Sequence, residues 1–142
     1  MKVYLDTCCY NRPFDNQNQV KIELETKAKL YVQNKIRNKE YKLVWSFMLD
    51  YENKDHPYNE KKDKIQTWKN IATEFCDFHE EIRSKGKELE KVNIKPNDAL
   101  HIACAIFSKC DYFLTTDYKL INKNIKEINI INPLDFVTKI GE

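Results

Sequence analysis

Four acidic residues lie at or just beyond the expected ends of short apolar segments: Asp6, Glu52, Asp98 and Asp117. In an open α/β sheet, ligands bind beyond the carboxyl ends of the strands, so acids in these places can meet in one cleft. Carboxylates gathered there repel one another unless cations lie between them. Oxygen ligands favour Mg²⁺ or Mn²⁺, which can support hydrolysis of a phosphodiester without a histidine or serine nucleophile.

Each of the four acids also has a purely structural interpretation when it is considered alone. Asp6 could close an Asx-turn at the end of a strand, and Glu52 could be a solvated helix residue. Asp98 and Asp117 could cap helices. The joint pattern, rather than any single acid, therefore predicts the metal site.

Residues near the acids leave two points open. Asp50 or Asp55 could replace Glu52 as a ligand if the helix register differs from the expected one. His101 lies three residues after Asp98 and shares its helix face, so it could assist the metal. The apolar residues around His101 favour a packed, hydrogen-bonded side chain instead.

The elements that must position these residues alternate along the chain. Apolar segments at 2–5, 43–45, 112–114 and 128–131 are too short for helices and rich in β-formers, so they are predicted strands. Helical periodicity predicts helices at 19–38, 47–53, 62–84 and 96–109, and a short helix after Asp117. The polar stretch 50–64 is predicted to be a loop and a helix start. This alternation predicts an α/β fold with a central, mainly parallel sheet.

Size and composition predict one compact domain spanning residues 1–142. The chain has 42% hydrophobic residues, enough to bury a core, and 32% charged residues, which predict a polar surface. Its formal net charge of +2 gives no global attraction to a polyanion, so a nucleic-acid site must be a local patch. The acid at position 6 and the absence of a long apolar run argue against a signal peptide and a membrane span.

Two residue types exclude other classes of protein. Gly86 and Gly141 are the only glycines, so the glycine-rich phosphate loops of P-loop and dinucleotide-binding folds cannot form, and no nucleotide cofactor is expected. The five cysteines are odd in number and have no zinc-like CxxC or CxxH spacing, which favours a reduced cytoplasm.

Four segments resemble, in order, the motifs of PIN-domain proteins: V-Y-L-D-T (3–7), S-F-M-L-D-Y-E (46–52), N-D-A-L-H-I-A-C-A (97–105) and D-Y-F-L-T-T-D (111–117). The third and fourth segments are the most specific. The resemblance implies a three-layer α/β/α fold and an endoribonuclease that hydrolyses RNA phosphodiester bonds with Mg²⁺ or Mn²⁺. It also implies that Asp6, Glu52, Asp98 and Asp117 are both the catalytic and the metal-binding residues.

The resemblance extends to small hydroxyl residues beside the acids. Thr7, Ser46 and Thr115 match positions where such side chains orient carboxylates or contact phosphate. Each could equally be only a turn or capping group.

Basic residues are the expected contacts to the RNA backbone. The opening C-C-x-N-R-P-F is similar to that of a subset of stand-alone prokaryotic PIN proteins, and Arg12 within it is either a phosphate contact or part of a surface turn. Lys119 and Lys123 follow Asp117 closely and are predicted to bind the backbone, although lysine clusters are often only solvated.

The resemblance also implies partners. Many small PIN proteins are toxins that a cognate antitoxin inhibits, so an RNA substrate, an antitoxin protein and a homodimer are expected. The alternative is a catalytically weak PIN-fold module that binds RNA or protein, and the presence of all four acids argues against it. A phosphoacceptor domain would require a second acid beside the nucleophilic aspartate, but Asp6 stands alone at its strand end.

Overall fold

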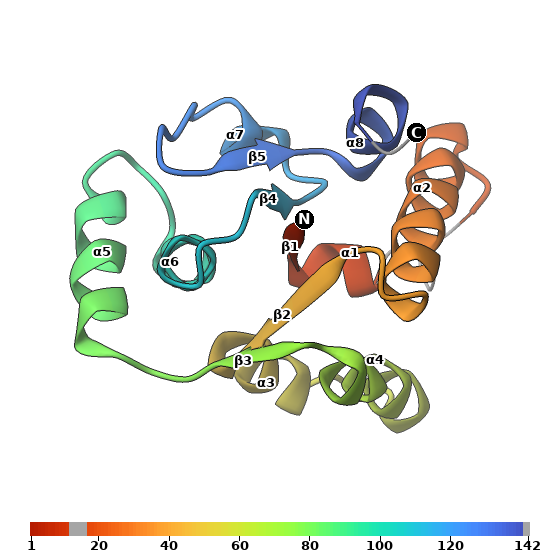
Figure 1. The fold of residues 1–142 in the computed structure, drawn as a ribbon, viewed down its shortest axis with the longest axis horizontal. Helices are drawn as coiled ribbons and strands as arrows, with labels where there is room; N and C mark the ends of the chain where they lie inside the picture. Colours follow the sequence, from red (N-terminus) through yellow and green to blue (C-terminus); the bar gives the residue numbers. More distant parts are fainter. Residues whose placement is uncertain (12–16, 141–142) are drawn as a thin grey trace.

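The computed structural model describes residues 1–11 and 17–140, which form a central sheet surrounded by helices (Figure 1). In chain order the elements are β1 (Lys2–Leu5), α1 (Thr7–Asn11), α2 (Val20–Arg37), β2 (Lys42–Ser46), α3 (Phe47–Lys54), α4 (Asn59–Ile71), β3 (Glu74–Cys76), α5 (Glu80–Glu90), α6 (Pro96–Phe107), β4 (Tyr112–Leu114), α7 (Tyr118–Ile121), β5 (Asn129–Ile131) and α8 (Pro133–Lys139). The five strands are all parallel and lie in the order β3-β2-β1-β4-β5. The first strand of the chain is therefore the middle strand of the sheet.

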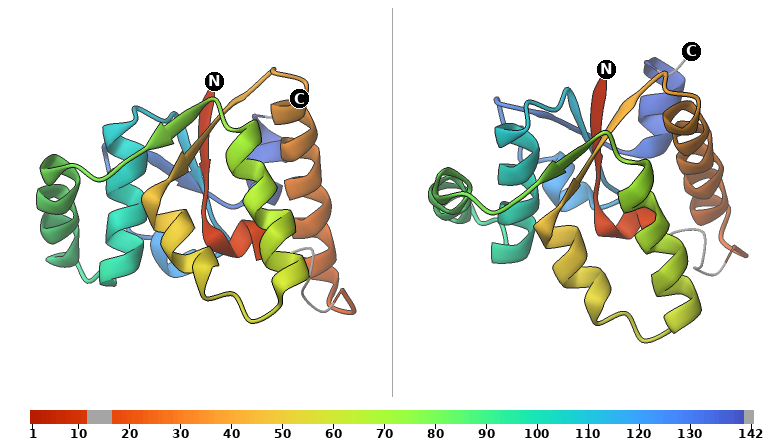
Figure 2. Two further views of the ribbon diagram at one scale, coloured as in Figure 1. Left: turned by 90° about the horizontal axis from the view of Figure 1, so that it is seen from below. Right: turned by 60° about the horizontal axis from the view of Figure 1, so that its bottom comes forward.

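Helices cover both faces of the sheet (Figures 1 and 2). On one face, α6 lies between α5 and the strands, while α2, α4 and α8 lie on the other. The short helices α1, α3 and α7 gather at the end of the sheet toward which the strands point (Figure 2). This is a three-layer α/β/α fold with a parallel central sheet, as the sequence predicted.

The inner strands are buried because helices cover both of their faces. Val3, Tyr4 and Leu5 of β1 are 0% exposed, and Phe113 of β4 stacks on Tyr4 with 5.2 Å between the ring centroids. Such continuous apolar strands are typical of parallel sheets enclosed between helices. The core therefore holds the ends of β1, β2 and β4 in fixed positions.

Most predicted elements are confirmed with small shifts of boundary. The predicted strands 2–5 and 112–114 coincide with β1 and β4, and 43–45 and 128–131 overlap β2 and β5. The predicted helices 19–38, 47–53 and 96–109 correspond to α2, α3 and α6, and α7 follows Asp117 as expected.

The predicted helix 62–84 is wrong. The helix α4 ends at Ile71, because Ala72 turns to an extended conformation at φ −58° and ψ 140°. Strand β3 then pairs with β2, and a second helix, α5, begins only at Glu80. In the stretch 50–64 the loop is shorter than predicted, since α3 continues to Lys54, but the predicted helix start is confirmed because α4 begins at Asn59. Pairing with β2 overrides the helical periodicity of this segment.

Helix α1 was not expected from the sequence. It begins immediately after Asp6, with a hydrogen bond of 2.9 Å from the Cys9 amide to the Asp6 carbonyl. Arg12 lies outside the described residues, so neither interpretation of it is tested. Within 1–11 and 17–140, no helix combines the length and apolar character needed to cross a membrane.

Candidate metal centre

Asp6 lies at the carboxyl end of the central strand. Its amide donates to the Leu114 carbonyl at 3.0 Å, so the pairing of β1 with β4 continues to this residue. Its Oδ1 accepts the Thr7 amide at 2.8 Å, and its Oδ2 accepts the Thr115 hydroxyl at 2.9 Å. The carboxylate is thus held by one neighbour in sequence and by one from the adjacent strand, and its residue is only 7% exposed.

Glu52 reaches the same place from α3. Ser46 ends β2 and caps α3, since its Oγ accepts the Leu49 amide at 3.3 Å. The Glu52 side chain then points back to α1, where its Oε1 accepts the Thr7 hydroxyl at 2.6 Å. Thr7 therefore contacts both acids, through its amide to Asp6 and through its hydroxyl to Glu52.

The register of α3 directs Asp50 and Asp55 elsewhere. Asp50 accepts hydrogen bonds from Trp45 Nε1 at 2.8 Å and from Lys69 Nζ at 2.9 Å, on the side of α3 that faces α4. Asp55 is exposed at the C-terminal end of α3. Of the three acids left open by the sequence, Glu52 is the one beside Asp6.

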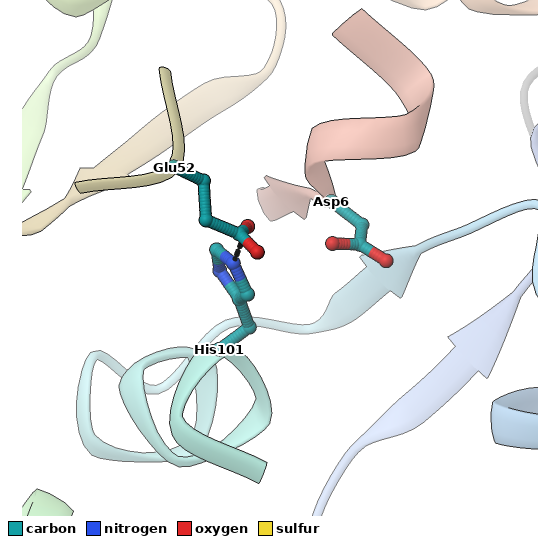
Figure 3. A group of neighbouring side chains, drawn as sticks. All are labelled: Asp6, Glu52 and His101. Carbon is teal, nitrogen blue, oxygen red and sulfur yellow. Dashed lines mark hydrogen bonds and ion pairs between the residues drawn. The ribbon is translucent and has the colours of Figure 1, made fainter. Parts of the chain in front are cut away.

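His101 of α6 completes the closest group of side chains. Potential ligand atoms of Asp6, Glu52 and His101 all lie within 4.8 Å of one another. Figure 3 shows the three side chains coming from three separate parts of the chain, with His101 Nε2 in contact with Glu52 Oε1. Carboxylate oxygens and an imidazole nitrogen are ligands that divalent metal ions accept.

A buried tyrosine orients this histidine. The Tyr4 hydroxyl lies 2.6 Å from His101 Nδ1 and 2.6 Å from Ser46 Oγ, and all three side chains are almost completely buried. Both ring nitrogens of His101 therefore have partners, Tyr4 on one side and Glu52 on the other. The packed, hydrogen-bonded interpretation of His101 is confirmed, and the packing places it against an acid of the site.

His101 and Glu52 shift the pKa values of each other. Burial alone would lower the pKa of His101, but the hydrogen bond to Glu52 and the charges of Asp6, Glu52 and Asp98 raise it. Burial likewise favours a higher pKa for Glu52, but the contact with His101 and the Thr7 hydroxyl lower it. Without a metal, the pair therefore favours an imidazolium beside a carboxylate, which offsets part of the negative charge.

Asp98 and Asp117 lie around this closest group rather than within it. The pKa of Asp98 is raised, first by burial and then by the negative charges of Asp6, Asp117 and Glu52. Asp117 caps α7 by accepting the Lys119 amide at 2.9 Å. The four acids therefore share one electrostatic environment at the end of the sheet, while Asp117 also has the structural role of a helix cap.

The predicted hydroxyl residues fall into two groups. Thr7 contacts Glu52, and Thr115 contacts Asp6 while also accepting the Asp117 amide at 3.1 Å. Ser46 instead bonds Tyr4 and caps α3, so it acts on the acids only through intermediate residues. Lys119 is exposed in the first turn of α7.

Two residues near the acids had no predicted role there. Tyr4 is hidden in an apolar strand, where a tyrosine looks like an ordinary core residue. Cys8 is half-buried, and its Sγ lies 3.6 Å from Asp6 Oδ2 and 3.4 Å from Thr115 Oγ1. Its position directly after Thr7 is the one sequence signal that could have indicated this contact.

The PIN-domain family model matches residues 3–126 of the chain. The match includes all four acids, β1 from Val3 onward, and the whole of β2, β3 and β4. The chain belongs to the PIN-domain family.

A solved structure supports the same fold. A chain of VapBC2 from Rickettsia felis, crystallised bound to a DNA fragment from their promoter, is similar to this protein over 93% of this chain and 98% of that chain, with a TM-score of 0.58 and 19% sequence identity. A search of curated proteins gave no match.

Proposed function

We propose that this protein is a divalent-metal-dependent endoribonuclease that hydrolyses RNA phosphodiester bonds at Asp6, Glu52, Asp98 and Asp117. The observation that carries the proposal is the convergence of these acids from four separate parts of the chain, with mutual repulsion strong enough to contribute to a raised pKa of Asp98. Membership of the PIN-domain family supports a nuclease over other metal-binding proteins.

The residues fit a small divalent cation. Asp6 and Glu52 would hold the ion, with Asp98 and Asp117 completing the site directly or through water. A cation bound there would supply Lewis-acid polarisation of a phosphate oxygen and would lower the pKa of water. Neutralising the clustered carboxylates would also remove a repulsion that the folded chain otherwise bears.

The remaining residues would position the acids and the substrate. Thr7 donates a hydrogen bond to Glu52, and Thr115 donates one to Asp6. These bonds limit the rotamers that the two carboxylates can adopt. Lys119 extends from the first turn of α7, beside Asp117, and would contact the RNA backbone by its charge. Arg12 remains a proposed phosphate contact.

A toxin that an antitoxin inhibits is the proposed biological setting. The similar structure from Rickettsia felis is VapBC2, solved with DNA from their promoter, and this supports an antitoxin partner here. A homodimer and a cytoplasmic location are further parts of this proposal. The free thiols Cys8, Cys9, Cys76, Cys104 and Cys110 agree with a reduced compartment.

The proposal is tested by measuring thermal unfolding and RNA cleavage together, with and without Mn²⁺, for wild type and Asp98→Asn. Wild type should gain stability and cut RNA only with metal. Asp98→Asn should fold, be as stable or more stable without metal, bind Mn²⁺ at least about tenfold more weakly and lose cleavage.

Asp63→Asn, at an exposed acid of α4, is the matched control and should behave as wild type. If Mn²⁺ leaves wild-type unfolding unchanged and no RNA is cut, the nuclease proposal is wrong. The acids would then be caps and turn residues of a PIN-fold binding module.

A further inference from the structure

A cavity with a largely polar lining lies away from the acids, between α1, α2 and α4. Its volume is about 240 Å³, and its polar lining comes from Tyr10, Lys29, Gln33, Arg37, Lys64 and Thr67. None of the described residues that line it is acidic. Three cationic side chains thus surround a hollow to which the described chain contributes no carboxylate.

Lys29 is the unusual member of this group. It lies in the middle of α2, is only 4% exposed, and forms no ion pair with any described carboxylate. Its ammonium group instead lies over the Tyr10 ring, 5.6 Å from the centroid. Burial lowers its pKa to about 8, and the like charge of Arg37 acts in the same direction. A buried ammonium group is costly unless an anion accompanies it.

Two further buried polar atoms of the cavity residues lack a partner. The Tyr10 hydroxyl and the Gln33 side-chain nitrogen form no hydrogen bond, although their residues are 1% and 4% exposed. Buried polar groups are nearly always satisfied, so unpaired ones need an explanation. Both atoms can donate, but each has almost no exposed surface, so neither one reaches a ligand in the cavity without turning toward it.

Arg37 and Lys64 add positive charge at the rim of the cavity. Arg37, the last residue of α2, stacks over the Trp68 ring at 4.9 Å from its centroid, so its planar group is held in place. Lys64 of α4 pairs only with Glu60, at 3.5 Å on the exposed surface, and such a pair is weak. Guanidinium and ammonium groups together bind phosphate well, the first through a fork of donors and the second as a point charge.

We propose that the cavity between α1, α2 and α4 binds a phosphate group, with Lys29 as the inner cation and Arg37 and Lys64 at the rim. The ligand is a phosphate monoester or free phosphate, because several oxygens can then accept from several donors at once. This site stands independently of the proposed nuclease activity. The same chemistry could come from the terminal phosphate of an RNA strand or from a free nucleotide.

The first experiment measures thermal unfolding against inorganic phosphate at constant ionic strength, in metal-free buffer that contains a chelator. Removing metal prevents phosphate from binding through a cation at the acids. Wild type should show a saturable rise of Tm. Lys29→Met should fold with an equal or higher Tm without phosphate and bind phosphate roughly tenfold more weakly or worse.

Lys27→Met, on the exposed face of the same helix, is the matched control and should keep the wild-type response. Arg37→Gln provides a second test on a surface residue, which protects against failure of Lys29→Met to fold, and it should also weaken binding. No saturable response in wild type, or equal responses in Lys29→Met and Lys27→Met, would overturn the proposal.

A second set of titrations separates the sources of the phosphate. The probes are inorganic phosphate, AMP, and one short RNA with either a 5′-phosphate or a 5′-hydroxyl. If the phosphorylated RNA binds more tightly than AMP and Lys29→Met removes only that advantage, the site takes a strand terminus. If AMP or phosphate binds as tightly as the RNA, the site takes a free ligand. Identical affinity of Lys29→Met and wild type for all four probes would again overturn the site.

Discussion

At the scale of single residues, Tyr4 connects the core to the acids. Its hydroxyl joins Ser46, which caps α3, to His101, which contacts Glu52. The ring itself is fixed by stacking on Phe113. Tyr4 is uncharged, yet it fixes the orientation of the His101 imidazole. Because His101 contacts Glu52, Tyr4 also influences where the Glu52 carboxylate points.

Tyr4→Phe should keep the ring packing but leave His101 Nδ1 without its partner and remove one of the two hydrogen bonds of Ser46 Oγ. We expect a loss of about 1–3 kcal/mol in the free energy of unfolding and roughly tenfold weaker Mn²⁺ binding. Urea unfolding and a Mn²⁺ titration measure the two effects. Tyr51→Phe, at an exposed tyrosine of α3, is the control. Unchanged Mn²⁺ affinity in a destabilised Tyr4→Phe would limit Tyr4 to a structural role.

Lys29 should produce a distinctive pH dependence of stability. Its pKa is about 8 in the folded state against 10.5 for an ordinary lysine, so the unfolded chain binds more protons between these values. Stability from this residue therefore rises as pH increases from about 8 to 10.5, by roughly 3 kcal/mol at most. Lys29→Met should lack this rise, and Lys27→Met should retain it. Urea unfolding at several pH values across this window gives the comparison, and parallel profiles for both variants would contradict it.

The placement of the four acids near one end of the sheet could be predicted from the sequence, but the contacts between them could not. Asp6, Glu52, Asp98 and Asp117 stand at ends of local patterns, so position alone indicated a shared edge. The bonds of the Tyr4 hydroxyl join residues 42 and 97 positions apart, and that of Thr115 to Asp6 joins residues 109 apart. No local pattern specifies such partners, because they depend on the packing of the strands that carry them.

At the scale of elements, the buried strands were predicted accurately from the sequence and the exposed strand β3 was not. β1 and β4 are apolar and enclosed, and their bounds coincide with the predicted ones. β3 is a three-residue edge strand in which only Cys76 is buried, so it has no apolar pattern of its own. Its extended conformation comes from pairing with β2. No sequence pattern within residues 62–84 indicates this pairing, because the partner strand lies elsewhere in the chain.

The contact between α5 and α6 depends on Gly86. A Cβ atom at this position would lie 3.1 Å from Leu100 Cδ2, closer than a comfortable contact. Gly86→Val should destabilise the fold by about 1–3 kcal/mol, because the added atoms force these two helices apart. Mn²⁺ affinity per folded molecule should change little. Urea unfolding and a Mn²⁺ titration test both statements, and a Gly86→Val protein as stable as wild type would show that the helices adjust freely.

At the scale of the whole molecule, all five strands share one sheet, and we propose that residues 1–142 unfold as one unit. The transition followed by far-UV circular dichroism should then coincide with that followed by tryptophan fluorescence, which reports on Trp45 in β2 and Trp68 in α4. Urea titrations of the wild type provide both curves. Separate midpoints would indicate a part of the fold that unfolds independently.

The central position of β1 has a consequence for synthesis. β1 leaves the ribosome first, yet one of its neighbours, β4, emerges only with residues 112–114, and the Thr115 bond to Asp6 forms later still. Long-range pairing of this kind must wait for nearly the whole described chain. The nascent protein therefore carries Asp6 apart from Thr115 until residues 112–115 have left the ribosome and β4 has paired with β1.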